Sequence, residues 1–75
     1  MSWPLIGITT RQIYTPDGWQ AFSLLRAYVD AVLEAGGEPL LIPASLPSEK
    51  AHSVLEKLDG LILSGGGDIH PRFSP

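Results

Sequence analysis

The chain has 75 residues and a formal net charge of −3, with 44% hydrophobic and 17% charged residues. This composition is typical of one small folded domain and argues against intrinsic disorder. Its five basic residues are scattered, which gives a nucleic-acid partner little electrostatic support, and the absence of cysteine excludes a disulfide framework or a thiol nucleophile within the chain.

The first predicted element is a strand at Leu5–Thr9. It is apolar throughout and does not alternate, which is typical of a strand buried on both faces of a parallel sheet. A polar loop over residues 10–18 follows, and its Pro16-Asp17-Gly18 sequence is a turn signal.

A long amphipathic helix is predicted next. Asp17 and Gln20 have the spacing of an N-cap residue and its reciprocal partner three positions later. Gly36-Gly37 predicts a left-handed C-cap, and Pro39 prevents continuation. These signals predict a helix of about five turns. Its apolar positions recur at three- and four-residue steps: Phe22, Leu25, Val29, Val32 and Leu33.

The second half of the chain repeats the pattern. Residues 40–42 predict a second strand, and Ser48 predicts the N-cap of a second helix that Gly60 ends. Ala51, Val54, Leu55 and Leu58 are expected on the buried face of this helix. Residues 61–63 predict a third strand.

The order strand–helix–strand–helix–strand predicts an α/β fold, half of an open doubly wound parallel sheet of the flavodoxin-like kind. We expect the first strand between the second and the third. Three strands leave an apolar edge bare, so residues 1–75 are expected to be the N-terminal part of a single larger α/β/α domain.

A glycine-rich segment, Ser64-Gly65-Gly66-Gly67-Asp68, follows the third strand directly. Consecutive glycines let backbone N–H groups converge on an anion or an oxyanion. A tight turn that needs flexible residues is the alternative. The spacing matches neither the Walker nor the dinucleotide-binding glycine pattern.

Three blocks together resemble the N-terminal part of the gamma-glutamyl-gamma-aminobutyrate hydrolase family, within the class I glutamine amidotransferase-like superfamily. They are residues 4–9, residues 28–43 and, most specifically, residues 58–71, with the sequence Leu-Asp-Gly-Leu-Ile-Leu-Ser-Gly-Gly-Gly-Asp-Ile-His-Pro. The family commonly continues Pro-x-x-Tyr, whereas Pro71 is followed three residues later by Ser74.

The resemblance implies a flavodoxin-like α/β/α fold and hydrolysis of a small gamma-glutamyl amide, with no cofactor. It implies a cysteine nucleophile assisted by a histidine and a glutamate further along, none of which lies in this chain. It places Gly66 as a backbone oxyanion donor, with Gly67 as its neighbour. The 75 residues alone are therefore expected to be inactive.

Two side chains are candidates for substrate binding. Arg11 follows the carboxyl end of the first strand, where it could pair with a substrate carboxylate; a solvated loop arginine is the alternative. His70 could line the pocket mouth or be a structural loop residue. Asp68 and His70 lack a third ligand, so no metal site is predicted.

Other residues have structural interpretations. Thr9 and Thr10 could offer hydroxyls near the site. Asp59 is expected to be structural, in the turn before Gly60. Trp19 and Phe22 are expected in the core or at an interface rather than as ligand platforms.

Several alternatives remain open at this stage. They are a glutaminase domain that feeds ammonia to a synthase, a non-catalytic module that binds an anion or phosphate, and a truncated chain without activity. Apolar runs are too interrupted to span a membrane and the N-terminus lacks a signal-peptide basic region, so a cytoplasmic location is expected. A homo-oligomer is compatible with the sequence.

Overall fold

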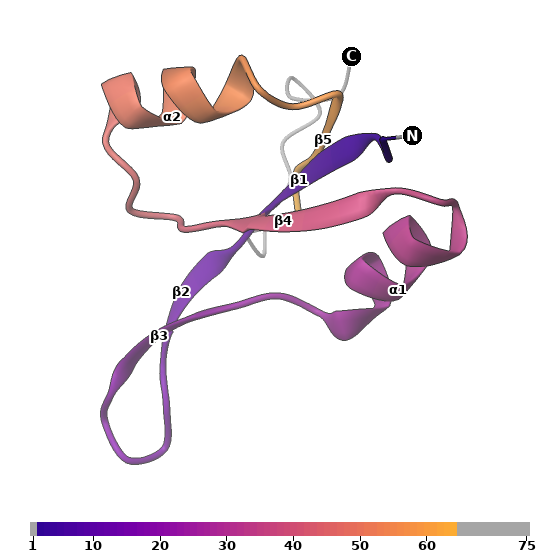
Figure 1. The fold of residues 1–75 in the computed structure, drawn as a ribbon. Coiled ribbons are helices and arrows are strands. Elements are labelled where there is room, and N and C mark those ends of the chain that lie inside the picture. Colours follow the sequence, from indigo (N-terminus) through magenta and orange to yellow (C-terminus); the bar gives the residue numbers. More distant parts are fainter. Residues whose placement is uncertain (1, 65–75) are drawn as a thin grey trace.

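The structure is a computed structural model and describes residues 2–64. Parallel strands form a central sheet, and a hairpin extends from one end of it (Figure 1). The elements in chain order are β1 (Leu5–Thr9), β2 (Arg11–Tyr14), β3 (Gln20–Ser23), α1 (Arg26–Glu34), β4 (Glu38–Ile42), α2 (Ser48–Leu55) and β5 (Gly60–Ile62).

The main sheet has the strand order β4-β1-β5, and both pairings are parallel. The expectation that the first strand is central is therefore confirmed, and its bounds are those predicted. Ile8, in the middle of β1, is fully buried because strands flank it on both sides. The α/β class with a parallel sheet is confirmed.

The two helices lie on opposite sides of this sheet (Figure 1). Successive residues of a strand point to opposite faces, so the neighbours of Ile6 and of Gly7 show which helix covers each face of the sheet. On the Ile6 face, Gly37 follows α1, and a Cβ added to it would lie 3.1 Å from Ile6 Cγ1. On the Gly7 face, Leu58 follows α2, and a Cβ added to Gly7 would lie 2.6 Å from Leu58 Cδ1. Helices on both faces are the doubly wound arrangement.

A reciprocal pair of hydrogen bonds joins the start of β1 to the turn before β5. The backbone N–H of Leu5 donates to Asp59 Oδ2 at 2.7 Å, and the N–H of Asp59 donates to the Leu5 carbonyl at 2.8 Å. This confirms the structural interpretation of Asp59. These hydrogen bonds help to fix the register of the short strand β5 against β1.

The predicted long helix is wrong in its first half. Residues 11–14 and 20–23 form an antiparallel hairpin, and α1 begins only at Arg26. Gly18, with φ +88°, lies in the connecting turn, which the Gly18 N–H closes by donating to the Thr15 carbonyl at 2.8 Å. The Asp17–Gln20 capping box therefore does not form. The predicted C-cap is confirmed, since Gly36 has φ +89°.

The other boundaries differ by a few residues. Strand β4 begins at Glu38 and includes Pro39, which an edge strand tolerates because one side of its backbone needs no donor. Helix α2 has Pro47 rather than Ser48 at its N-cap and ends at Leu55. Of its predicted buried face, Ala51, Val54 and Leu58 are half-buried and form the less exposed side, whereas Leu55 is wrong, at 45% exposed. Strand β5 begins at Gly60, one residue earlier than predicted.

The described residues contain no helix that is both long and apolar enough to cross a membrane. This agrees with the interrupted apolar runs of the sequence. The expected cytoplasmic location stays a prediction.

Candidate functional site at the carboxyl edge of the sheet

The carboxyl ends of β1, β4 and β5 meet at one edge of the sheet, since all three strands run parallel. In open α/β sheets this edge is where ligands bind. The three segments that leave it are the hairpin from Arg11, the turn from Pro43 and the segment that begins at residue 63. The sequence predicted the first and the third of these segments to border the site.

Thr10 joins the first two segments. Its backbone N–H and its hydroxyl both donate to the Ile42 carbonyl, at 3.1 and 2.9 Å. The residue is 5% exposed, so its hydroxyl satisfies a backbone acceptor at the end of β4. The interpretation of Thr10 as a substrate-facing hydroxyl is wrong; it fixes where the hairpin leaves the sheet.

Thr9 joins the first and third segments. The Ser64 N–H donates to Thr9 Oγ1 at 3.0 Å, and the Ser64 hydroxyl donates to the Thr9 carbonyl. These two contacts join residues 55 positions apart and hold the last described residue before the glycines. Sequence reasoning placed Thr9 at this edge but gave it no partner.

Arg11 begins β2 and is exposed. The ion pairs found among residues 2–64 do not include it; they are Arg26 with Asp30 and His52 with Glu56, both at the surface of helices. Its guanidinium therefore stays a candidate for pairing with a substrate carboxylate.

The remaining predicted site residues, Gly66, Gly67 and His70, lie outside the described residues. So does Asp68. Their roles stay predictions. Within residues 2–64, no group of three or more His, Cys, Asp or Glu side chains could hold a metal ion.

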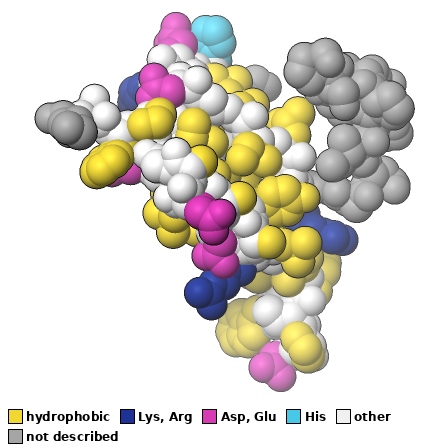
Figure 2. Space-filling view, turned by 90° about the vertical axis from the view of Figure 1, so that its right-hand side faces the viewer, with side chains coloured by type: hydrophobic (Ala, Val, Ile, Leu, Met, Phe, Trp, Pro, Cys, Tyr) yellow, Lys and Arg dark blue, Asp and Glu magenta, His cyan; other side chains and the backbone are white. Residues whose placement is uncertain are grey.

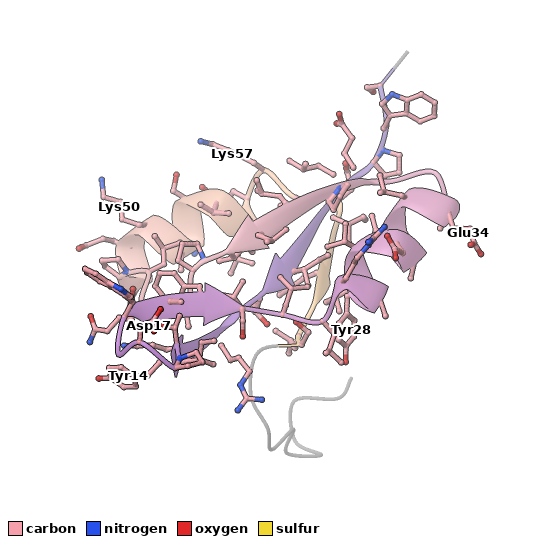
Figure 3. All side chains as sticks on the ribbon, turned by 90° about the horizontal axis from the view of Figure 1, so that it is seen from below. Tyr14, Asp17, Tyr28, Glu34, Lys50 and Lys57 are labelled. Carbon is pink, nitrogen blue, oxygen red and sulfur yellow. The ribbon has the colours of Figure 1, made fainter. Side chains whose placement is uncertain are left out.

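The hairpin places aromatic rings at the surface beside this edge. Trp19 is 73% exposed, Tyr14 67% and Phe22 47%. Of the two places expected for Trp19 and Phe22, the core is therefore wrong, and an interface stays a prediction. Figure 3 shows Tyr14 and Asp17 on the hairpin, at the far end of the molecule from Glu34. The signal available was the Pro16-Asp17-Gly18 turn between two short segments that carry Ile13, Tyr14, Trp19 and Phe22, residue types favoured in strands.

Comparison with known proteins identifies the family. The profile of the Peptidase C26 family matches residues 4–74, nearly the whole chain. The chain belongs to the Peptidase C26 family. The glutamine amidotransferase-like resemblance is thereby confirmed at the level of the family.

Curated relatives of this Peptidase C26 chain agree. A putative glutamine amidotransferase-like protein of Rickettsia prowazekii is 38% identical over 76 residues, which cover 93% of this chain and 26% of the relative. Protein NtpR of Enterococcus hirae is 37% identical over 93% of this chain and 30% of its own length. A putative glutamine amidotransferase of Schizosaccharomyces pombe is 41% identical over 60% of this chain and 17% of its own length.

The chain thus spans less than a third of the length of these curated relatives. What a complete protein of the Peptidase C26 family does requires residues beyond this length. The chain's own contribution is the sheet edge built by Thr9, Thr10 and Ser64.

Proposed function

We propose that this chain is the N-terminal part of a cysteine-dependent hydrolase of gamma-glutamyl amides and supplies its oxyanion loop. The observation that carries the proposal is the double contact between Thr9 and Ser64. It anchors the residue before Gly65-Gly66-Gly67 at the carboxyl edge of a parallel sheet. Membership of the Peptidase C26 family supports the reaction class.

The groups that carry out the proposed reaction come partly from this chain and partly from the rest of the proposed domain. A cysteine thiolate, which these 75 residues do not contain, attacks the gamma-carbonyl carbon of the substrate. The carbonyl oxygen becomes an oxyanion, and the Gly66 N–H donates to it. The amine leaves after taking a proton from the catalytic histidine. Water then cleaves the gamma-glutamyl thioester, which releases glutamate and restores the thiol.

The role of Ser64 in this scheme is to hold the start of the loop. Three glycines have little conformational preference of their own, so a fixed residue on the strand side is needed for their N–H groups to point in one direction. The Thr9 contacts supply that fixed point before substrate arrives. Preorganised donors stabilise a developing charge more than donors that must reorient.

A glutaminase domain that feeds ammonia to a synthase is the second candidate. The observation that favours it is that two of the relatives are described as putative glutamine amidotransferases or amidotransferase-like. The same loop would serve it. Release of ammonia from glutamine, but not of larger amines from other gamma-glutamyl amides, would favour this candidate.

The test is a substitution of Gly66 in the complete protein that carries residues 1–75. Replacing Gly66 with Val should lower kcat by about 10²–10³, the effect of losing one oxyanion donor. Gly36→Ala is the control for a glycine substitution away from the carboxyl edge of the sheet, because Gly36 follows α1 and has no atom within 4 Å of an added Cβ. A folded Gly66→Val protein with an unchanged rate would reject the oxyanion assignment.

A further inference from the structure

One face of the β2–β3 hairpin carries an uncharged set of amide and aromatic side chains. In the antiparallel register Gln12 pairs with Phe22 and Tyr14 pairs with Gln20, and paired residues lie on the same face. All four are exposed. The Gln20 Nε2 donates to the Tyr14 hydroxyl at 3.3 Å. Exposed aromatic residues beside hydrogen-bonding groups are typical of a binding surface.

This face borders a hollow rather than open solvent. The hollow has a volume of about 350 Å³ and lies between the hairpin and the turn that follows β4. Small-molecule pockets start at about 300 Å³, so it can hold one small organic group. Its lining consists of Gln12, Gln20, Ala21, Phe22 and Ser45.

The hollow lies at the same edge of the sheet as the proposed oxyanion loop. The hairpin begins one residue after β1, where Thr10 is bonded to Ile42, and Ser45 comes three residues after β4 ends. Ser64, at the start of the loop, is bonded to Thr9, the residue before Thr10. A substrate whose scissile bond lies at the loop can therefore extend its other side toward the hairpin.

We propose that this face of the hairpin binds the leaving-group side of the substrate and selects an uncharged aromatic or amide-bearing amine. The proposal rests on the proposed gamma-glutamyl function. A flat ring packs against Phe22, while the Gln12 and Gln20 amides and the Ser45 hydroxyl bond its polar edge.

The chemistry of the lining also predicts what is rejected. No charged side chain lines the hollow among the described residues. Arg11 lies on the other face of the hairpin, because it precedes Gln12 and side chains alternate. A leaving group that ends in a carboxylate, such as 4-aminobutyrate, should bind poorly. Its carboxylate would lose hydrating water in the hollow and find no positively charged side chain to pair with.

The experiment compares three substrates in the complete protein that carries residues 1–75: gamma-glutamyl anilide, gamma-glutamyl-4-aminobutyrate and glutamine. We expect kcat/KM for the anilide to exceed that for the 4-aminobutyrate conjugate by about tenfold or more. Phe22→Ala should lower kcat/KM for the anilide by about tenfold and leave that for glutamine within about twofold, because glutamine has no group beyond the scissile nitrogen.

Trp3→Ala is the matched control. Trp3 is an aromatic residue that is 58% exposed, but it precedes the amino end of β1, at the opposite edge of the sheet. Trp3→Ala should leave kcat/KM unchanged for both the anilide and glutamine. If Phe22→Ala changes the anilide and glutamine rates equally, or changes neither, the hairpin assignment is overturned while the proposed function stands.

A binding measurement separates the two proposals. Acetanilide has no gamma-glutamyl group, and we expect it to shift the side-chain amide NMR signals of Gln12 and Gln20 in the wild type but not in Phe22→Ala. Those shifts in a protein that hydrolyses no gamma-glutamyl amide support the hairpin site and reject the proposed function. If the protein shows no acetanilide-induced shifts and no hydrolysis of gamma-glutamyl amides, both proposals are overturned. Concentration-dependent shifts without ligand would show that a second copy covers this face, which also overturns the proposal.

Discussion

Two adjacent threonines at the end of β1 make contacts in different directions. Thr10 bonds the end of β4 through the Ile42 carbonyl, and Thr9 bonds the end of β5 through Ser64. The backbone N–H and C=O groups of successive strand residues point alternately toward the two neighbouring strands, so one short sequence can contact both. These contacts hold the three segments that border the proposed site.

The Thr9 contact is testable as a positioning effect. Thr9→Val keeps the side-chain shape but removes the oxygen that accepts from the Ser64 N–H, so the loop loses part of its anchor. We expect kcat of the complete protein to fall about tenfold with KM within about twofold, since the donor acts on the transition state. Thr9→Ser keeps the oxygen and should restore most of kcat. Equal loss in both variants would contradict a positioning role for the hydroxyl.

Gly7 is a second residue whose identity is set by a neighbour. A Cβ at this position would lie 2.6 Å from Leu58 Cδ1 and 2.7 Å from Ile42 Cδ1. Gly7→Ala should therefore lower the free energy of unfolding by about 1–2 kcal/mol through overpacking. Gly60→Ala is the control, because its nearest contact would be 3.1 Å away and the loss should be smaller. Urea unfolding of each variant gives the comparison; equal losses would contradict the packing argument.

At the scale of elements, the hairpin is the least supported part of the fold. A two-stranded hairpin is marginal by itself in water, and this one leaves Trp19 and Tyr14 largely exposed. Its stability depends on its turn, where the Thr15 N–H donates to the Trp19 carbonyl at 2.8 Å and the Trp19 N–H donates to Thr15 Oγ1 at 3.0 Å. A binding surface carried on such an element can adjust to its ligand.

Gly18 tests this view of the hairpin. It has φ +88° with no atom near the position of an added Cβ, so substitution costs backbone strain but no clash. Gly18→Ala should weaken the hairpin by about 1 kcal/mol, and Gly18→Asn by less, because Asn tolerates the left-handed region. Amide exchange at Trp19 should speed up about fivefold in Gly18→Ala while exchange at Ile8 stays unchanged. Equal acceleration at both residues would mean that the hairpin unfolds only with the sheet.

At the scale of the whole molecule, the described core is small. Only Ile8, Val32 and Ile42 are buried hydrophobic residues among residues 2–64. A largely apolar hollow of about 390 Å³ lies beside α1 and β5, and hydrophobic side chains are spread across one side of the molecule (Figure 2). Its lining includes Ile6, Val32 and Leu61. An exposed hydrophobic surface of this kind is typical of a site that packs against further protein.

The isolated chain of 75 residues is therefore expected to be weakly stable or self-associated, and inactive. It should bind a hydrophobic dye such as ANS and sediment with a concentration-dependent mass, because no strand among residues 2–64 pairs with the outer side of β4 or β5. It should release no glutamate from a gamma-glutamyl amide, since it has no thiol. A monomer that unfolds cooperatively without binding dye would contradict the first expectation, and turnover would contradict the cysteine mechanism.

The sequence alone determined the parallel α/β sheet, and it predicted the edge at which we propose the site. An apolar run without alternation at Leu5–Thr9 indicates a strand flanked on both sides, and that is how β1 lies. Glycine at position 36 predicted the end of α1, since a positive φ is a local property of the backbone. The glycine-rich segment after the third strand predicted the edge where the site is built.

Only the tertiary structure decided between helix and hairpin for residues 11–23. The helical spacing of Phe22 and Leu25 and the turn signal at Pro16-Asp17-Gly18 are both present in the sequence, and pairing of β2 with β3 decided between helix and hairpin. Contacts between distant residues were also beyond sequence reasoning. Ser64 with Thr9 and Leu58 with Gly7 depend on how strands and helices pack, because short-range patterns carry no information about which distant residues become neighbours.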